Sequence, residues 1–193
     1  MIADLARTWG RRLIEPIARF LGRLGLTPNA ITILGFLLTV AVAGVLASGR
    51  LRLAGLLLII TLGADALDGT LARLTGAVTR FGGFLDSTLD RWAEAALYGA
   101  LVWHFLRVDQ DTAVLLAVAA MAASLLVSYT RARAEGAGLQ CKEGLFTRFE
   151  RLALLIAGLL FDLIVPALWI IAILAGLTAI QRIWVTYQAD RKA

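Results

Sequence analysis

Six long apolar runs dominate the pattern of hydrophobic and polar positions, and short polar stretches separate them. Each run is close to the ~20 residues that an α-helix needs to cross a bilayer. We expect membrane spans at about 29–48, 52–75, 81–105, 112–134, 150–165 and 167–187. The pattern therefore predicts an all-α integral membrane protein with six transmembrane helices, which form a bundle over 29–187.

The first 26 residues show a different pattern. Apolar side chains recur there every three or four positions, and arginines fall largely between them. This spacing predicts an N-terminal amphipathic helix over 1–26 that lies in the membrane interface and is bent or broken near Pro16. Thr27 and Pro28 then form a helix-start signal, with Thr27 as the cap. Because no linker or repeat interrupts the chain, we expect one membrane domain over 1–193.

Basic residues are distributed unevenly between the two sides of this topology. With the N-terminus in the cytoplasm, only three of the 19 lysines and arginines fall on the far side, namely Arg50, Arg52 and Arg107. Loops rich in Lys and Arg stay in the cytoplasm. We therefore expect a multi-pass protein of the cell membrane with both termini in the cytoplasm.

Composition agrees with a membrane protein. Hydrophobic residues make up 60% of the chain and the mean hydropathy is +0.80, whereas soluble domains average roughly 45–50% apolar residues. The net charge of +5 comes from basic residues between apolar runs. This placement favours anionic lipid or a phosphorylated substrate as the partner, rather than nucleic acid. Cys141 is the only cysteine, which excludes an intramolecular disulfide.

Four aspartates interrupt the second and third apolar runs. On a helix, Asp65 and Asp68 share about one third of the circumference with the small residues Gly69 and Ala72, and Arg73 lies at its edge. In the next run, three residues follow at four-residue spacing: Gly82, Asp86 and Asp90. Two consecutive helices are thus predicted to present two carboxylates each from facing stripes near the cytoplasmic side.

Four converging carboxylates would raise one another's pKa and destabilise a bundle unless cations neutralise them. All-oxygen ligands favour Mg²⁺ or Mn²⁺ over zinc. Two such ions are suited to phosphoryl transfer, because they stabilise both the attacking and the leaving oxygen. Arg73 is placed to pair with a phosphate. The alternative is that each aspartate is simply hydrogen-bonded within the bundle.

The stretch Asp65–Arg73 and the three residues after the loop spell D-x2-D-G-x2-A-R-x8-G-x3-D-x3-D. This pattern resembles the signature of the CDP-alcohol phosphatidyltransferase family, and the resemblance extends over the whole chain. It implies that Asp65 and Asp86 bridge two metal ions, while Asp68 completes one site and Asp90 the other. Asp90 is also implied as the general base that takes the proton of the acceptor hydroxyl. The activated oxygen attacks the β-phosphorus of a CDP-linked lipid, and CMP leaves.

The same resemblance implies which residues bind CDP-diacylglycerol or a related CDP-lipid: Asn29, Ala30, Ile31, Thr32, Gly69, Ala72, Arg73, Thr79 and Gly82. For the "NAIT" stretch at 29–32, ordinary helix capping after Pro28 is the alternative interpretation. A homodimer is expected by resemblance alone.

A second basic cluster, "TRARAEGAGLQCKEGLFTRFER", lies on the same predicted side. Arginine forms bidentate contacts with phosphate, and positive-inside bias is the alternative explanation. Several of these residues resemble those of the phosphatidylinositol phosphate synthases within the family. The resemblance implies that four arginines bind a phosphate on a phosphorylated polyol acceptor: Arg131, Arg133, Arg151 and Arg182.

Inositol 1-phosphate is therefore the first expected acceptor, and the second is glycerol 3-phosphate, as in a phosphatidylglycerophosphate synthase. That branch commonly has D-P-x-A-D-K, which Asp86–Arg91 fits poorly. The inositol phosphate branch tends to carry E-R-x-E-R. Here Thr147 replaces the first Glu and Phe149 fills the middle position, which leaves the exact inositol contacts open. A cation transporter or channel, or a membrane scaffold, is the alternative of another class. A channel would distribute its acidic residues along a pore, whereas here they gather at one end of two helices beside Arg73.

Overall fold

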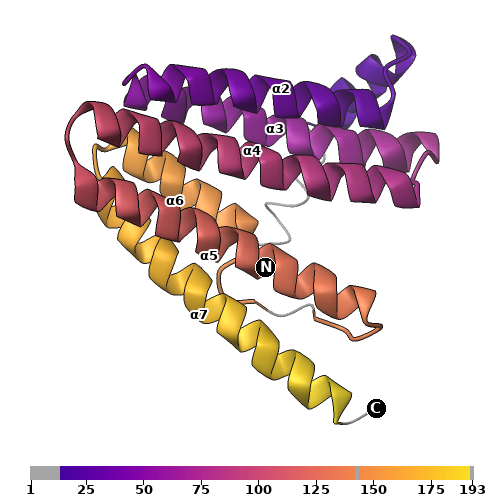
Figure 1. Cartoon of the computed structure of the whole chain (residues 1–193). Coiled ribbons are helices and arrows are strands. Elements are labelled where there is room, and N and C mark those ends of the chain that lie inside the picture. Colours follow the sequence, from indigo (N-terminus) through magenta and orange to yellow (C-terminus); the bar gives the residue numbers. More distant parts are fainter. Residues whose placement is uncertain (1–13, 142–143, 192–193) are drawn as a thin grey trace, which may run out of the picture. The chain divides into compact units, whose positions relative to one another are not determined.

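The structure, a computed structural model, describes residues 14–141 and 144–191, with the side chains of 63–65 excepted. All regular secondary structure in these residues is helical (Figure 1). A helix over residues 14–23 precedes six others. They are α2 Pro28–Ala47, α3 Leu51–Thr75, α4 Arg80–Arg107, α5 Asp111–Gly136, α6 Arg148–Leu160 and α7 Ile164–Asp190. The first part of the predicted interfacial helix, 1–13, lies outside the described residues.

The first four predicted spans agree with the observed helices to within two residues at each end. The boundary between the last two spans was predicted wrongly, since the predicted spans 150–165 and 167–187 separate at residue 166. The structure ends α6 at Leu160 and places Pro166 in the first turn of α7. A proline is tolerated there because the first turn leaves its backbone N–H groups unbonded in any case. The chain instead turns at Asp162, whose φ is 56°.

Three of the described helices are long and apolar enough to cross a membrane: α2, α5 and α7. Helices α3 and α4 carry the charged residues of the aspartate motif, and α6 has only 13 residues. At 1.5 Å per residue α6 extends about 20 Å, less than the ~30 Å hydrocarbon core. The chain is thus an all-α membrane protein, and six complete spans remain a prediction.

The chain divides into two compact units, and α2, α3 and α4 each contribute to both. Unit 1 takes in the described residues of Met1–Val42 and Leu57–Ala96. In it, the helix over residues 14–23 packs against α2 and α3 through a core of buried and half-buried side chains: Ala18, Leu21, Ile31, Leu67 and Leu71. The same helix exposes Ile17 and Phe20, two of the apolar residues whose spacing predicts an interfacial helix. That the helix lies in the membrane interface stays a prediction.

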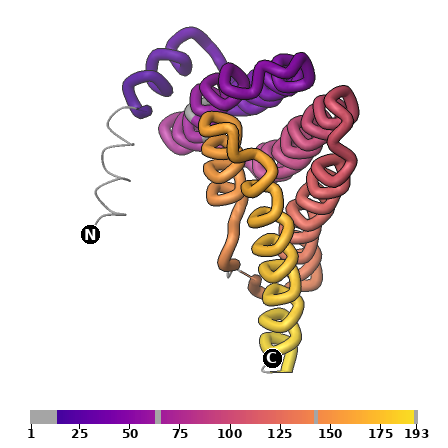
Figure 2. Tube along the Cα trace, turned by 90° about the vertical axis from the view of Figure 1, so that its left-hand side faces the viewer, coloured from indigo at the N-terminus to yellow at the C-terminus, as the bar shows by residue number. Residues whose placement is uncertain are grey.

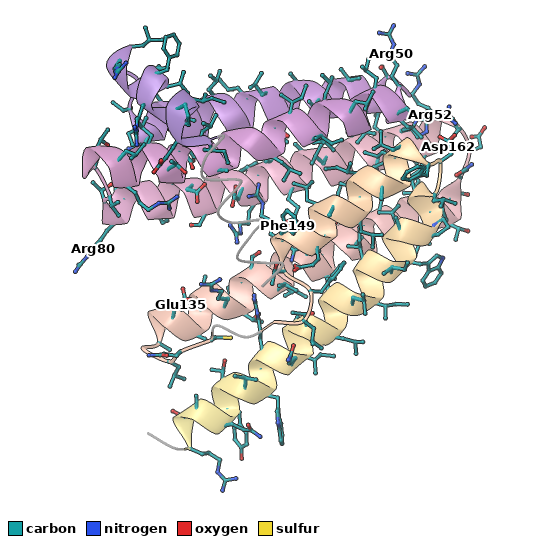
Figure 3. The ribbon with its side chains drawn as sticks, turned by 180° about the vertical axis from the view of Figure 1, so that it is seen from behind. Arg50, Arg52, Arg80, Glu135, Phe149 and Asp162 are labelled. Carbon is teal, nitrogen blue, oxygen red and sulfur yellow. The ribbon has the colours of Figure 1, made fainter. Side chains whose placement is uncertain are left out.

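Unit 2 takes in the described residues of Ala43–Leu56 and Leu97–Ala193. Helix α5 packs along α7, and α6 packs against α7 (Figure 2). The corner between α6 and α7 is tight, since a Cβ on Gly158 would lie 2.7 Å from the Cβ of Ala167. At the same end of the unit, Arg52 forms an ion pair with Asp162 of the turn between α6 and α7 (Figure 3).

Candidate active site

A cavity of about 360 Å³ opens in unit 1, where the first turns of α2 and α4 meet the last turns of α3. Its lining comes from these three helices and from the loop between α3 and α4. The lining residues are Pro28, Asn29, Thr32, Asp68, Gly69, Ala72, Arg73, Ala77, Val78, Thr79, Gly82, Gly83 and Asp86. Nine of the thirteen residues that the sequence nominates for metal or CDP-lipid binding therefore lie around one cavity.

Asp68 supplies a carboxylate from α3. It is only 7% exposed, and α2 provides a hydrogen bond to it: the Thr32 hydroxyl donates to Oδ2 over 2.7 Å. The other oxygen, Oδ1, accepts the backbone N–H of Gly69. A buried carboxylate is costly unless its oxygens are hydrogen-bonded or paired, and these two contacts offset part of that cost.

Arg73 lies one turn further along α3. Its Nη2 donates to Thr70 Oγ1 over 3.1 Å, and its guanidinium lies over Gly69. A Cβ on Gly69 would lie 3.4 Å from Nη1, an ordinary van der Waals contact. A positive group and the Asp68 carboxylate thus line the same wall, an arrangement suited to a ligand that carries both phosphates and a cation.

The α4 side of the cavity begins with a helix cap. The backbone N–H of Gly82 donates to Thr79 Oγ1 over 2.9 Å, which makes Thr79 the cap of α4. Gly82 also allows α2 to approach, because a Cβ there would lie 3.0 Å from Thr79 Oγ1 and 3.2 Å from Asn29 Oδ1. Asp86 lines the cavity one turn later.

The remaining two predicted metal ligands are Asp90 and Asp65. Asp90 follows one turn after Asp86, outside the lining, and its Oδ2 lies 3.4 Å from Nη1 of Arg91. The same Nη1 donates to the backbone oxygen of Ser87 over 2.7 Å. The side chain of Asp65 lies outside the described residues. Among those described, no three His, Cys, Asp or Glu side chains form a group that would hold a metal ion.

The "NAIT" stretch divides between two environments. Asn29 and Thr32 line the cavity, whereas Ile31 packs in the core of unit 1. Ala30 donates its backbone N–H to Thr27 Oγ1 over 3.2 Å, which places Thr27 at the cap of α2. The sequence interpretation missed four lining residues: Pro28, Ala77, Val78 and Gly83. Pro28, Val78 and Gly83 each adjoin a nominated residue, which was the available signal, and Ala77 precedes Val78 in the same loop.

The four arginines nominated for the acceptor phosphate all belong to unit 2. Arg131 and Arg133 are exposed on α5, whereas Arg151 and Arg182 are 1% and 4% exposed. Nη1 of Arg182 donates to the backbone oxygen of Val127. Glu135 accepts a 2.8 Å hydrogen bond from Nε of Arg131.

The segment before α6 packs directly on Arg182. A Cβ on Gly144 would lie 2.7 Å from Nη2 and 3.1 Å from Nε of Arg182, so a larger residue there would require the guanidinium to shift. Gln181 holds the neighbouring residue, since its Oε1 accepts the backbone N–H of Leu145 over 3.2 Å. Gly144 had no signal in the sequence, because this contact joins residues far apart in the chain.

Thr147 and Glu150 explain one departure from the inositol phosphate branch. The backbone N–H of Thr147 donates to Glu150 Oε2 over 2.8 Å, and its hydroxyl contacts the same carboxylate. Together the two residues form a capping box at the start of α6. Phe149 points out of the unit and is exposed (Figure 3). At these two positions the chain therefore has a helix cap and an exposed aromatic ring.

Fold and site together define a class: an all-α membrane protein whose polar cavity combines carboxylates with a guanidinium. Comparison of the sequence with known protein families identifies the family within this class. Residues 25–184 match the sequence profile of the CDP-alcohol phosphatidyltransferase family. The chain therefore belongs to the CDP-alcohol phosphatidyltransferase family, and it is a transferase.

Several relatives are similar over nearly the whole chain. The archaetidylinositol phosphate synthase of Pyrococcus horikoshii is 39% identical over 93% of this chain and 92% of its own length. The crystal structure of Mycobacterium tuberculosis phosphatidylinositol phosphate synthase with CDP-DAG bound superposes with a TM-score of 0.87 at 32% identity, covering 91% of this chain and 94% of that one. A structure of the same enzyme with manganese and citrate has a TM-score of 0.86 at 32% identity, covering 90% and 88%.

Proposed function

We propose that this protein transfers a phosphatidyl group from CDP-diacylglycerol, or a related CDP-lipid, to the hydroxyl of a phosphorylated polar alcohol and releases CMP. The acceptor proposed first is inositol 1-phosphate. The observation that carries the proposal is the cavity of unit 1, where residues of the family motif from α3 and α4 lie together. Relatives that carry the names of inositol phosphate synthases support the choice of acceptor.

The cavity is assigned to the cytidine diphosphate of the donor. Its volume of about 360 Å³ falls within the roughly 300–1,000 Å³ of small-molecule sites. Gly69 and Gly82 keep its walls free of side chains, and Arg73 provides the positive group for a phosphate. The CDP-DAG bound to the Mycobacterium tuberculosis enzyme supports this assignment.

The donor set of the cavity suits a hard divalent cation. Asp68 and Asp86 both line it and offer oxygen ligands only, as Mg²⁺ and Mn²⁺ prefer. We assign the metal ligands to Asp65, Asp68, Asp86 and Asp90, and the manganese of the relative supports this. Two such ions would stabilise the charge that develops on the attacking and leaving oxygens. Asp90 takes the proton of the acceptor hydroxyl as general base.

The acceptor's phosphate is assigned to Arg131, Arg133, Arg151 and Arg182. Positive-inside bias needs only surface charges, whereas Arg151 and Arg182 are buried. Arginine offers bidentate hydrogen bonds to a phosphate, which suits these side chains to the acceptor. The same argument holds for glycerol 3-phosphate, which remains the second candidate acceptor.

The membrane arrangement is part of the proposal. We place six spans over 29–187 in one domain over 1–193, with an interfacial helix over 1–26. Both termini and the active site face the cytoplasm, and the protein is assigned as a homodimer of the cell membrane. Sixteen of the 19 basic residues fall on the cytoplasmic side of this topology, which supports the orientation.

An assay of CMP release tests the function. The purified protein receives CDP-diacylglycerol and Mg²⁺ or Mn²⁺, and four acceptors are supplied separately: inositol 1-phosphate, glycerol 3-phosphate, inositol and serine. We expect release with inositol 1-phosphate, and none in the presence of a chelator. Release with glycerol 3-phosphate alone would replace the first acceptor by the second. No release with any acceptor would contradict transfer from this donor.

A further inference from the structure

The hydroxyl of Thr32 connects α2 to the carboxylate of Asp68, 36 positions along the chain. Thr32 Oγ1 lies 2.7 Å from Asp68 Oδ2 and 3.1 Å from the backbone oxygen of Pro28. A threonine hydroxyl has one hydrogen to donate. The nearer and negatively charged acceptor takes it, because hydrogen bonds to ionised groups are shorter and stronger.

This contact sets the orientation of the carboxylate. Asp68 is 7% exposed, and its second oxygen accepts the backbone N–H of Gly69. The branched Cβ of a threonine in a helix limits χ1 to two main rotamers, and the observed rotamer directs the hydroxyl at Oδ2. The orientation of Asp68 therefore depends on a side chain of a different helix.

We propose that Thr32 is a positioning residue of the metal site, which holds the Asp68 carboxylate in the orientation that a divalent cation needs. The inference rests on the proposed function, since it assumes that Asp68 is a metal ligand. This positioning role is different from the role that the sequence resemblance implies for Thr32, which is direct binding of the CDP-lipid. Residues that hydrogen-bond to metal ligands typically account for 10–100-fold in metal affinity.

Titration of the purified full-length protein with Mn²⁺, without nucleotide, tests the inference. Thr32→Val keeps the shape of the side chain and removes the hydroxyl, so we expect its Mn²⁺ affinity to fall at least tenfold. Thr32→Ser retains the donor, and we expect its affinity to stay within about threefold of the unsubstituted protein, because only the χ1 restriction is lost.

Thr39→Val is the matched control on the same helix. The Thr39 hydroxyl donates to the backbone oxygen of Gly35 over 3.0 Å and has no carboxylate contact, so this variant loses only a bond within α2. Its Mn²⁺ affinity should equal that of the unsubstituted protein. An unfolding midpoint measured for each variant separates lost metal binding from a lost fold.

Two results would overturn the inference about Thr32 and leave the proposed function standing. Unchanged Mn²⁺ affinity in Thr32→Val would mean that the hydroxyl does not position Asp68 for a metal, as expected if Thr32 instead contacts the nucleotide directly. Equal weakening in Thr32→Ser and Thr32→Val would mean that the hydroxyl is not the cause. If the unsubstituted protein binds no Mn²⁺, both the proposed metal site and the inference fail.

Discussion

Gly144→Ala tests whether Arg182 binds the acceptor without altering any arginine. The added Cβ would lie 2.7 Å from Nη2 of Arg182, whereas ordinary contact begins at 3.4 Å. The two groups must therefore separate by roughly 0.7 Å, the difference between these distances.

Other contacts hold both the Arg182 side chain and the loop that contains Gly144. Arg182 is 4% exposed and bonded to the backbone oxygen of Val127. The loop is held beside Gly144 by the hydrogen bond between Leu145 and Gln181. Because the hydrogen bond of Leu145 holds the loop, we expect the flexible end of the Arg182 side chain to be displaced. Misplacing a binding group by about 1 Å costs up to roughly 100-fold in rate, so for 0.7 Å we expect about tenfold, or ~1.4 kcal/mol.

The assay is CMP release with one substrate varied at a time. We expect the KM for the phosphorylated acceptor to rise about tenfold in Gly144→Ala and the KM for the CDP-lipid to stay unchanged, because the donor is assigned to other residues. Gly136→Ala is the control, since a Cβ there meets nothing within 4 Å. An unchanged acceptor KM in Gly144→Ala, or an equal rise for the donor, would refute the assignment of Arg182.

Two further substitutions address catalysis and packing. Asp90→Asn should lower CMP release by roughly 10²–10⁴-fold, the usual contribution of a general base, and leave metal-dependent nucleotide binding largely intact; retained turnover would remove Asp90 as the base. Gly158→Ala should reduce the free energy of unfolding by about 1–3 kcal/mol, because its Cβ would lie 2.7 Å from that of Ala167. Unfolding in detergent measures this against Gly176→Ala, which meets nothing within 4 Å; equal stability of the two variants would contradict the packing argument.

Local patterns determined much of this protein in advance. Apolar runs near 20 residues predicted helices α2 to α5 to within two residues, because the thickness of a bilayer sets the length of a span. The spacing of the aspartate motif likewise predicted that residues of α3 and α4 share one site. Helical periodicity places the motif residues of each helix on one face of that helix, and the short loop between Thr75 and Arg80 makes the two helices consecutive.

Other features depend on how helices are turned toward one another, and only the tertiary structure decides them. The sequence did not distinguish buried Arg151 and Arg182 from exposed Arg131 and Arg133. It also did not indicate that Thr32 bonds Asp68. These contacts join positions far apart in the chain, so no local periodicity encodes them. The motif thus indicated the residues to which we assign the chemistry, while packing between helices decided their neighbours.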